Sequence, residues 1–143
     1  MLLKKSSKYK ECKDLINWVL ESEHLNQYNE IKKHKSFYNE CLNHKKLLKK
    51  LLVTLKKQNK KVVGYGASTK GNVLLQFCGI NSKIISNIAE VNKYKFNRYT
   101  PGSKIKIVSE KSVKLKKPDY MLVLPWHFKD YIVERERDFL KKG

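Results

Sequence analysis

The first sixty residues carry apolar side chains at helical spacing. One group recurs at steps of three and four residues and consists of Tyr9, Cys12, Leu15, Ile16, Val19 and Leu20. A second group runs from Tyr28 to Asn59, a stretch without glycine or proline that would extend about 48 Å as one helix. We therefore predict a helical lead-in over residues 1–60, whose long helix bridges to another body or packs along a domain edge.

From Lys61 onward, short apolar runs alternate with turns and helical patterns. The runs that predict strands are Val62–Val63, Ile84–Ala89, Ile105–Val108 and Tyr120–Leu124. Helices are predicted at Val73–Cys78, after Ser109, and at His127–Lys142. Strands that alternate with helices are typical of βαβ units. We predict an α/β fold over residues 61–143, a small Rossmann-like and mostly parallel sheet of about four strands with flanking helices.

A glycine-rich turn follows the first predicted strand. Gly64 and Gly66 permit a tight turn and a close approach of the backbone to a ligand. The amides of residues 67–69 would open the next helix, and helix N-termini attract anions. Lys70 puts a positive charge in the first helical turn, where only a bound anion would offset the unfavourable dipole. The pattern favours a phosphate or pyrophosphate ligand, and the alternative is a turn whose glycines serve packing alone.

Neither common nucleotide motif is complete at this turn. A dinucleotide motif would need glycine where Thr69 stands, and a P-loop would need a different order from Lys70-Gly71-Asn72. Glu90 ends the second predicted strand, where an acid of a Rossmann domain accepts hydrogen bonds from ribose hydroxyls. The alternative for Glu90 is a solvated loop carboxylate.

The charge is strongly basic, with a formal net value of +19. The only arginines are Arg98, Arg135 and Arg137, although base and phosphate recognition favours arginine. The lysines are spread along the chain, so we expect a solvated basic surface and no specific nucleic-acid partner. A lysine-rich RNA-binding protein is the less favoured alternative. It would be recognised by tight RNA binding whose affinity falls steeply with salt concentration.

No segment indicates a membrane, a metal or a disulfide. The start lacks the apolar stretch of a signal peptide, and the aliphatic run near Met121–Leu124 is too short to span a bilayer. We expect a soluble, cytoplasmic protein without a membrane partner. Cys12, Cys41 and Cys78 form no Cys-x-x-Cys pair, so neither a zinc site nor a disulfide framework is expected.

Three segments occur in a distinctive order: Val63–Asn72 (VGYGASTKGN), Arg98–Ser103 (RYTPGS) and Pro118–Trp126 (PDYMLVLPW). In this order they resemble the C-terminal domain of S-adenosylmethionine-dependent sugar C-methyltransferases, which methylate a carbon of a keto nucleotide sugar. The resemblance extends from about Leu15 to Val133 and includes the helical lead-in.

The resemblance implies that the chemistry lies on other domains. In the family, a zinc-binding N-terminal domain and a central S-adenosylmethionine-binding domain come first, and we expect both to be missing here. The family's general base lies in a Tyr-x-Glu-His motif of the central domain. Glu23-His24 does not complete that motif, because Glu21 stands where tyrosine is needed. We therefore expect no catalytic residue, no metal, no cofactor and no transferase activity in this chain alone, with S-adenosylmethionine on the missing domain.

The resemblance also implies which residues face a nucleotide diphosphate sugar: Gly64, Gly66, Ala67, Ser68, Thr69, Lys70, Gly71, Asn72, Glu90, Tyr99, Pro101, Gly102, Trp126 and His127. The chain departs from the family at Glu90, usually Asp, at Asn97, usually Gly, and at His127, often Asn. Trp126 and His127 could contact the ligand through stacking or a hydrogen bond, and the alternative is a core tryptophan at a strand end.

The function expected from these features is a substrate-binding and architectural domain. Its partners would be a nucleotide sugar and a methyltransferase domain in cis or in trans. The alternative is a stand-alone nucleotide-binding module with a regulatory role, which would bind its nucleotide without a partner domain.

Overall fold

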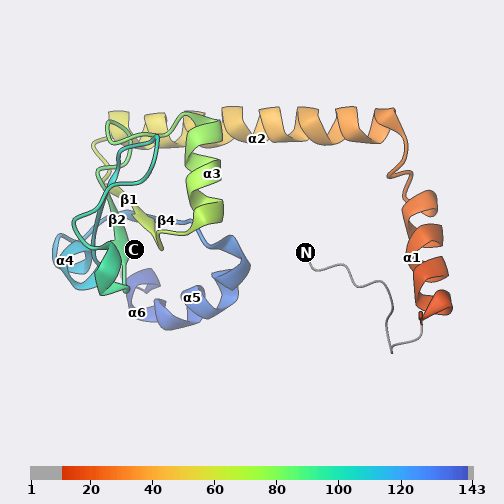
Figure 1. The fold of residues 1–143 in the computed structure, drawn as a ribbon. Helices are drawn as coiled ribbons and strands as arrows, with labels where there is room; N and C mark the ends of the chain where they lie inside the picture. Colours follow the sequence, from red (N-terminus) through yellow and green to blue (C-terminus); the bar gives the residue numbers. More distant parts are fainter. Residues whose placement is uncertain (1–10, 142–143) are drawn as a thin grey trace. The chain divides into compact units, whose positions relative to one another are not determined.

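A computed structural model describes residues 11–141, and the chain divides into two compact units, Met1–Leu42 and Asn43–Gly143 (Figure 1). The predicted helical positions Tyr9 and Lys142 lie outside the described residues. The second unit begins at Asn43, within a helix, because Leu52 and Leu55 of that helix are buried in its core.

Two helices make up the N-terminal part. Helix α1 spans Lys13–Leu25 and α2 spans Ile31–Lys57. Between them, Gln27 has a φ of +56°, and residues 26–29 form a turn, so α2 begins three residues later than the predicted start at Tyr28. Helix α2 ends where Asn59 takes a φ of +59° and the Lys60 amide donates to the Leu55 carbonyl, which is a common way of closing a helix.

The second unit is built on a four-stranded sheet with the order β3-β2-β1-β4. Its strands are β1 (Val62–Tyr65), β2 (Asn87–Glu90), β3 (Lys106–Ser109) and β4 (Tyr120–Val123), and every pairing is parallel. This confirms the α/β fold with an N-terminal helical segment. Strand β2 starts later than predicted, because Ile84 lies in a turn and Ile85 enters the core from the loop that follows.

The remaining helices connect these strands. They are α3 (Thr69–Cys78), α4 (Glu110–Leu115), α5 (Lys129–Arg135) and α6 (Arg137–Leu140), with short 3-10 turns η1 (Lys93–Lys95) and η2 (Trp126–Phe128). The single C-terminal helix predicted from His127 is thus divided into η2, α5 and α6, and Glu136 separates the last two.

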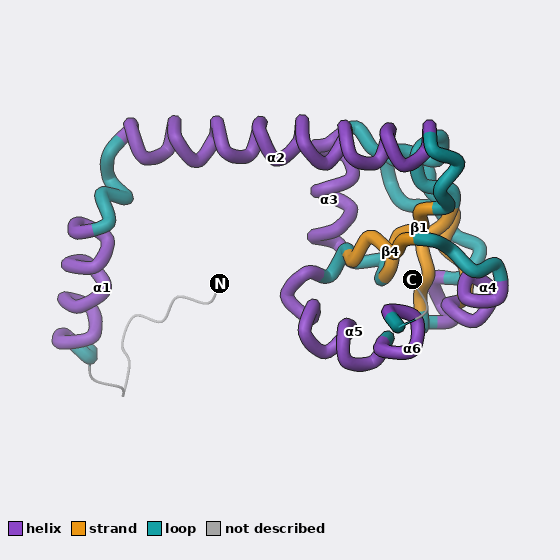
Figure 2. The backbone as a smooth tube through the Cα atoms, turned by 180° about the vertical axis from the view of Figure 1, so that it is seen from behind, coloured by secondary structure: helices purple, strands orange, loops and turns teal. Residues whose placement is uncertain are grey.

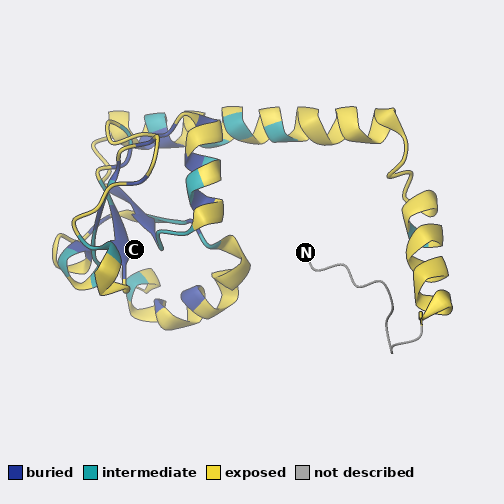
Figure 3. Ribbon diagram, viewed as in Figure 1, coloured by how far each residue is buried: buried dark blue, intermediate teal, exposed yellow. Residues whose placement is uncertain are grey.

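Each face of the sheet has its own apolar core. On one face, α3 and the second half of α2 pack on the strands through the residues Leu52, Leu55, Val62, Leu75, Cys78, Ile80, Ile85, Ile88, Ile105 and Leu124. On the other, α4 and α5 cover a smaller cluster made of Val63, Tyr65, Ala89, Val113 and Ile132. Figures 2 and 3 show the strands between these layers and the burial concentrated there. Burial of a side chain such as Leu75 or Ile88 contributes about 1.5–3 kcal/mol.

Candidate functional site

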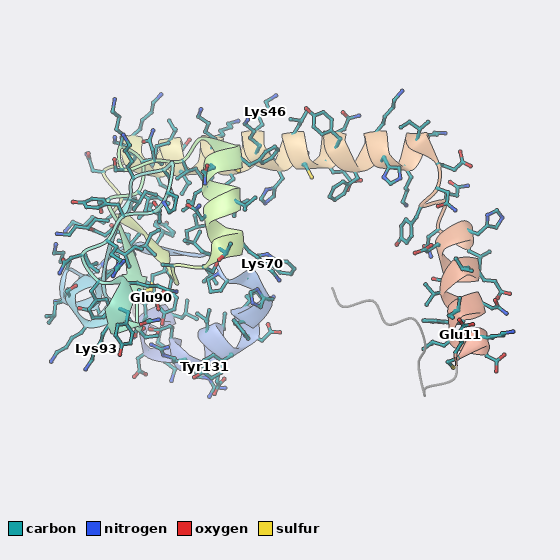
Figure 4. The ribbon with its side chains drawn as sticks, viewed as in Figure 1. Glu11, Lys46, Lys70, Glu90, Lys93 and Tyr131 are labelled. Atoms are coloured by element: carbon teal, nitrogen blue, oxygen red, sulfur yellow. The ribbon has the colours of Figure 1, made fainter. Side chains whose placement is uncertain are left out.

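A cleft of about 630 Å³ opens at the carboxyl edge of the sheet. Its walls come from the ends of β1 and β2, the turn after β1, the start of α4, and the segment from Pro125 to α5. The residues that line it are Tyr65, Gly66, Ala67, Ser68, Ala89, Glu90, Val91, Lys95, Glu110, Pro125, Phe128, Tyr131, Ile132 and Arg135. Figure 4 labels Glu90 and Tyr131 on two of these walls. In open α/β sheets, ligands bind at this edge.

The glycine-rich turn is held by close packing. Gly66 has a φ of +82°, and a Cβ on it would lie 2.7 Å from Pro125 Cδ. A Cβ on Gly71 would lie 2.5 Å from Leu124 Cβ, so α3 can cross the end of β4 only with glycine there. Packing against neighbouring side chains therefore requires glycine at both positions. Gly64 and Gly71 do not line the cleft.

Glu90 is buried, with 8% of its surface exposed, and it accepts hydrogen bonds with both carboxylate oxygens. Its Oε2 accepts from the Ala67 amide at 3.0 Å, and its Oε1 accepts from the amides of Val91 at 2.8 Å and Asn92 at 3.0 Å. Lys95 Nζ lies 3.3 Å from Oε2 and donates to the Ala67 carbonyl at 2.8 Å. The carboxylate thus ties the turn after β1 to the loop after β2.

This contact bears on two expectations. The Ala67 amide, where a phosphate was expected, donates to Glu90. Glu90 itself is buried and is not a solvated loop carboxylate. Burial by itself raises the pKa of the Glu90 carboxyl, but hydrogen bonds from Asn92, Val91 and Lys95 hold that pKa below its ordinary value.

The first turn of α3 leaves two amides for a ligand. The Ser68 side chain accepts from the Gly71 amide at 3.0 Å, and the Ser68 carbonyl accepts from the Asn72 amide. Within residues 11–141, no protein acceptor is found for the amides of Thr69 and Lys70. Neither residue lines the cleft, and Lys70 is exposed.

A charged network lies beneath the cleft, centred on the buried Tyr65. The Tyr65 hydroxyl lies 2.7 Å from Glu136 Oε1 and 3.1 Å from Glu110 Oε2. Lys114 Nζ bridges both acids at 2.7 and 2.8 Å. Arg135 pairs with Glu110, and its Cζ lies over the Tyr65 ring at 5.9 Å from the ring centroid. The two negative charges of the glutamates are balanced by the two positive charges of Lys114 and Arg135. This balance allows four charged side chains to share a partly buried site.

The pKa values of this network follow from its contacts. Burial, followed by the hydrogen bond to Glu136, raises the pKa of the Tyr65 hydroxyl far above its ordinary value. Burial alone would raise the pKa of Glu110, but hydrogen bonds from Arg135 and Lys114 lower it. The pKa of Arg135 is raised, and its hydrogen bond to Glu110 is the largest cause. Glu110, Lys114 and Arg135 therefore stay charged near neutral pH, and the Tyr65 hydroxyl stays protonated.

The sequence analysis missed this network. Along the chain, Tyr65 is 45 residues away from Glu110 and 71 residues away from Glu136. A tyrosine between the two glycines at the end of β1 is the one local signal that could have drawn attention to the cleft floor. The acidic and basic residues in α4, in α5 and directly after α5 follow the pattern of ordinary surface helices, and they gave no such signal.

The loop containing Tyr99, Pro101 and Gly102 lies away from the cleft. Residues 97–100 run antiparallel along the outer side of β3, with a bridge between Tyr99 and Lys106. The turn that follows precedes β3 and so lies at the amino edge of the sheet, where a Cβ on Gly102 would lie 2.7 Å from Gln76 Oε1. The turn after β1 and residues 99–102 are therefore at opposite edges, and the structure does not bring them to one ligand.

Trp126 and His127 are exposed in η2 and do not line the cleft. Trp126 is 65% exposed, so it is not the core tryptophan of the alternative prediction, and its ring packs edge-on against His127 at 5.9 Å. The next residue, Phe128, is the one that faces the cleft. Of the fourteen predicted ligand residues, the cleft brings together Gly66, Ala67, Ser68 and Glu90.

Within residues 11–141, no group of three or more His, Cys, Asp or Glu side chains could hold a metal ion. Across the same residues, every helix is too short or too polar to cross a membrane.

Comparison with known proteins places these features in a family context. The domain family described as "C-methyltransferase C-terminal domain" matches residues 1–143. The chain is also similar to the C-methyltransferase NovU of Streptomyces niveus, with 38% identity over 84 residues, which are 59% of this chain and 20% of NovU. The matched stretch thus spans about a fifth of the length of this relative.

Proposed function

Because the chain belongs to the C-methyltransferase C-terminal domain family, we propose that it binds the nucleotide-sugar substrate of a sugar C-methyltransferase. Methyl transfer takes place on a separate methyltransferase domain, supplied in cis or in trans. The chain alone has no transferase activity and acts by holding the substrate in position. Such positioning contributes to rate by converting an encounter between reactants into a reaction within one complex.

The cleft at the carboxyl edge of the sheet is the observation that carries this proposal. Its volume of about 630 Å³ falls within the range of about 300–1,000 Å³ that is typical of small-molecule sites. It is mostly apolar, with a few polar groups at its floor, as in many ligand sites.

The chemistry of the walls suits the two halves of a nucleotide sugar. Phe128 and Tyr131 offer aromatic surface to a base or a sugar ring, and both are more than half exposed. Arg135 and Lys95 bring positive charge to the cleft, each partly exposed and each paired with a carboxylate. A diphosphate would compete with those carboxylates for the two cations.

S-adenosylmethionine, which supplies the methyl group, is proposed to bind the methyltransferase domain. The turn after β1 is where Rossmann-type domains usually hold a cofactor. Here its Ala67 amide is bonded to Glu90, which supports the assignment of the cofactor to another domain.

Titration of the full chain with nucleoside diphosphate sugars tests the proposal. We expect amide chemical-shift changes at the cleft, centred on Ala67, Phe128 and Tyr131, for at least one compound of the panel. Pyrophosphate alone and the nucleoside alone, titrated in parallel, separate charge recognition from ring recognition.

Two tyrosine variants give a matched control. Tyr131→Ala removes a ring that lines the cleft, and we expect its dissociation constant to rise about fivefold or more. Tyr94→Ala removes a ring that is 88% exposed and lies outside the cleft, and it should leave affinity unchanged. If no compound shifts the cleft amides, or if both variants weaken binding equally, the cleft is not the substrate site.

A further inference from the structure

The helices of the N-terminal unit carry large apolar side chains that residues 11–42 themselves leave exposed. Helix α1 has no buried residue, and Trp18 and Leu15 are 64% and 57% exposed. In the first half of α2, Phe37 and Tyr38 are 67% and 59% exposed. Figure 3 shows both segments almost wholly exposed. Exposed apolar side chains that gather on helix faces mark interaction sites.

The exposed residues of α2 continue a face that already packs elsewhere on the same helix. At 3.6 residues per turn, Cys41 lies on the same side as Leu48, seven residues on, and as Leu52, eleven residues on. Leu52 and Leu55 are buried in the core of the second unit, and Leu48 packs against it. The same apolar face thus runs along the whole of α2, and Phe37, Tyr38 and Cys41 are its unpaired part.

The two units differ sharply in formal net charge. Residues 1–42 contain eight lysines and six acids, a formal charge of +2, whereas residues 43–143 carry the other +17. Helix α1 holds three carboxylates and one lysine, and residues 31–42 hold three lysines and one carboxylate. The N-terminal unit is therefore the part of the chain that can approach an identical unit without strong repulsion. Pairing α1 of one copy with α2 of another would bring opposite charges together at the rim.

We propose that the N-terminal unit is a homodimerisation element, in which a second copy of this chain covers the exposed faces of α1 and residues 31–42. A two-fold arrangement would repeat the same contact twice and assemble four helical segments around an apolar seam. Stable interfaces use about 20–30 residues from each side, which residues 11–42 can supply. This inference is independent of nucleotide-sugar binding.

Sedimentation velocity on the full chain over a concentration series tests the proposal. We expect a species of twice the 16.9 kDa chain mass at about 100 µM that dissociates on dilution. A wild-type chain that stays monomeric at that concentration overturns the proposal, even if it then binds a methyltransferase domain one to one.

Two pairs of variants locate the interface. Phe37→Glu and Val19→Glu place a charge on the apolar faces of α2 and α1, and each should raise the dimer dissociation constant about tenfold or more. Asn39→Glu and Asn17→Glu introduce the same charge two residues away, about 200° around the helix, and should leave it unchanged. Circular dichroism checks that helix content is retained. If each control weakens the dimer as much as its partner variant, these faces are not the interface.

Discussion

Replacement of Glu90 by glutamine tests whether this side chain holds the cleft together. Both carboxylate oxygens of Glu90 accept hydrogen bonds, with Oε2 facing the Ala67 amide and Oε1 facing the amides of Val91 and Asn92. In Glu90→Gln one of these oxygens becomes an NH2 group, which donates and cannot accept. Whichever way the glutamine amide turns, it places a donor against at least one backbone N–H.

The expected loss of stability in Glu90→Gln can be worked out from the hydrogen bonds that the glutamine retains. If the glutamine oxygen stays on Val91 and Asn92, the Ala67 amide loses its acceptor, and a buried unsatisfied donor costs about 1–3 kcal/mol. The pairing with Lys95 adds little, because that side chain is 42% exposed and can return to water. We therefore expect Glu90→Gln to lower the free energy of unfolding by about 2 kcal/mol.

Urea denaturation followed by far-UV circular dichroism measures this change. Glu134→Gln is the matched control, because Glu134 is 59% exposed and pairs only at the surface with Arg137, so it should cost less than about 0.5 kcal/mol. The Ala67 amide proton should also shift upfield in Glu90→Gln, because it loses a charged acceptor. Equal stability of the two variants, with an unchanged Ala67 resonance, would refute the role assigned to Glu90.

Three further predictions concern titration and the turn. The lowered pKa values of Glu90 and Glu110 contribute stability that is present above their ordinary value of 4.5 and is lost as the pH falls below it, so the urea midpoint should fall from pH 5 to pH 3. The raised pKa of Tyr65 has the opposite sign: its contribution is complete below its ordinary value of 10.0 and is lost above it, and ultraviolet titration should show one tyrosine that ionises only on unfolding. Gly66→Ala should cost about 2–4 kcal/mol through strain and the collision with Pro125. Gly79→Ala, with a φ of +65° and a Cβ that would meet only Lys49 Nζ, at an ordinary contact distance of 3.8 Å, should cost about 1 kcal/mol in the same urea assay.

The sheet and the turn could be predicted because their signals are local. The run Val62–Val63 followed by two glycines is enough to end a buried strand in a tight turn, and Ser68 caps the next helix with its own hydroxyl. The C-terminal pattern was also local but incomplete. Its apolar spacing fits one helix, whereas burial of Ile132 and of the Glu136 carboxylate fixes two short ones.

The course of residues 91–105 could not be predicted, because long-range pairing determines it. The Asn97 amide donates to the Ile107 carbonyl, and Asn97 and Lys104 both take positive φ values as the loop turns along β3. Thr100 then closes the turn by accepting from the Ile105 amide at 2.9 Å. Proline and glycine in the sequence indicated a loop there, but they did not indicate the edge of the sheet at which it lies.

Glu90 shows that an acid at one position of the sheet edge can serve an internal contact as well as a ligand. An acid at the end of β2 can accept from a ribose hydroxyl or from the turn after β1, since both lie at the same edge of the sheet. Here the Ala67 amide and Lys95 are fixed at 3.0 and 3.3 Å from the carboxylate, so no binding entropy opposes the internal contact. A ligand would have to displace donors that are already in place. An anion in this cleft would therefore have to be recognised by Arg135 of α5 and by Lys95, rather than by the Ala67 amide.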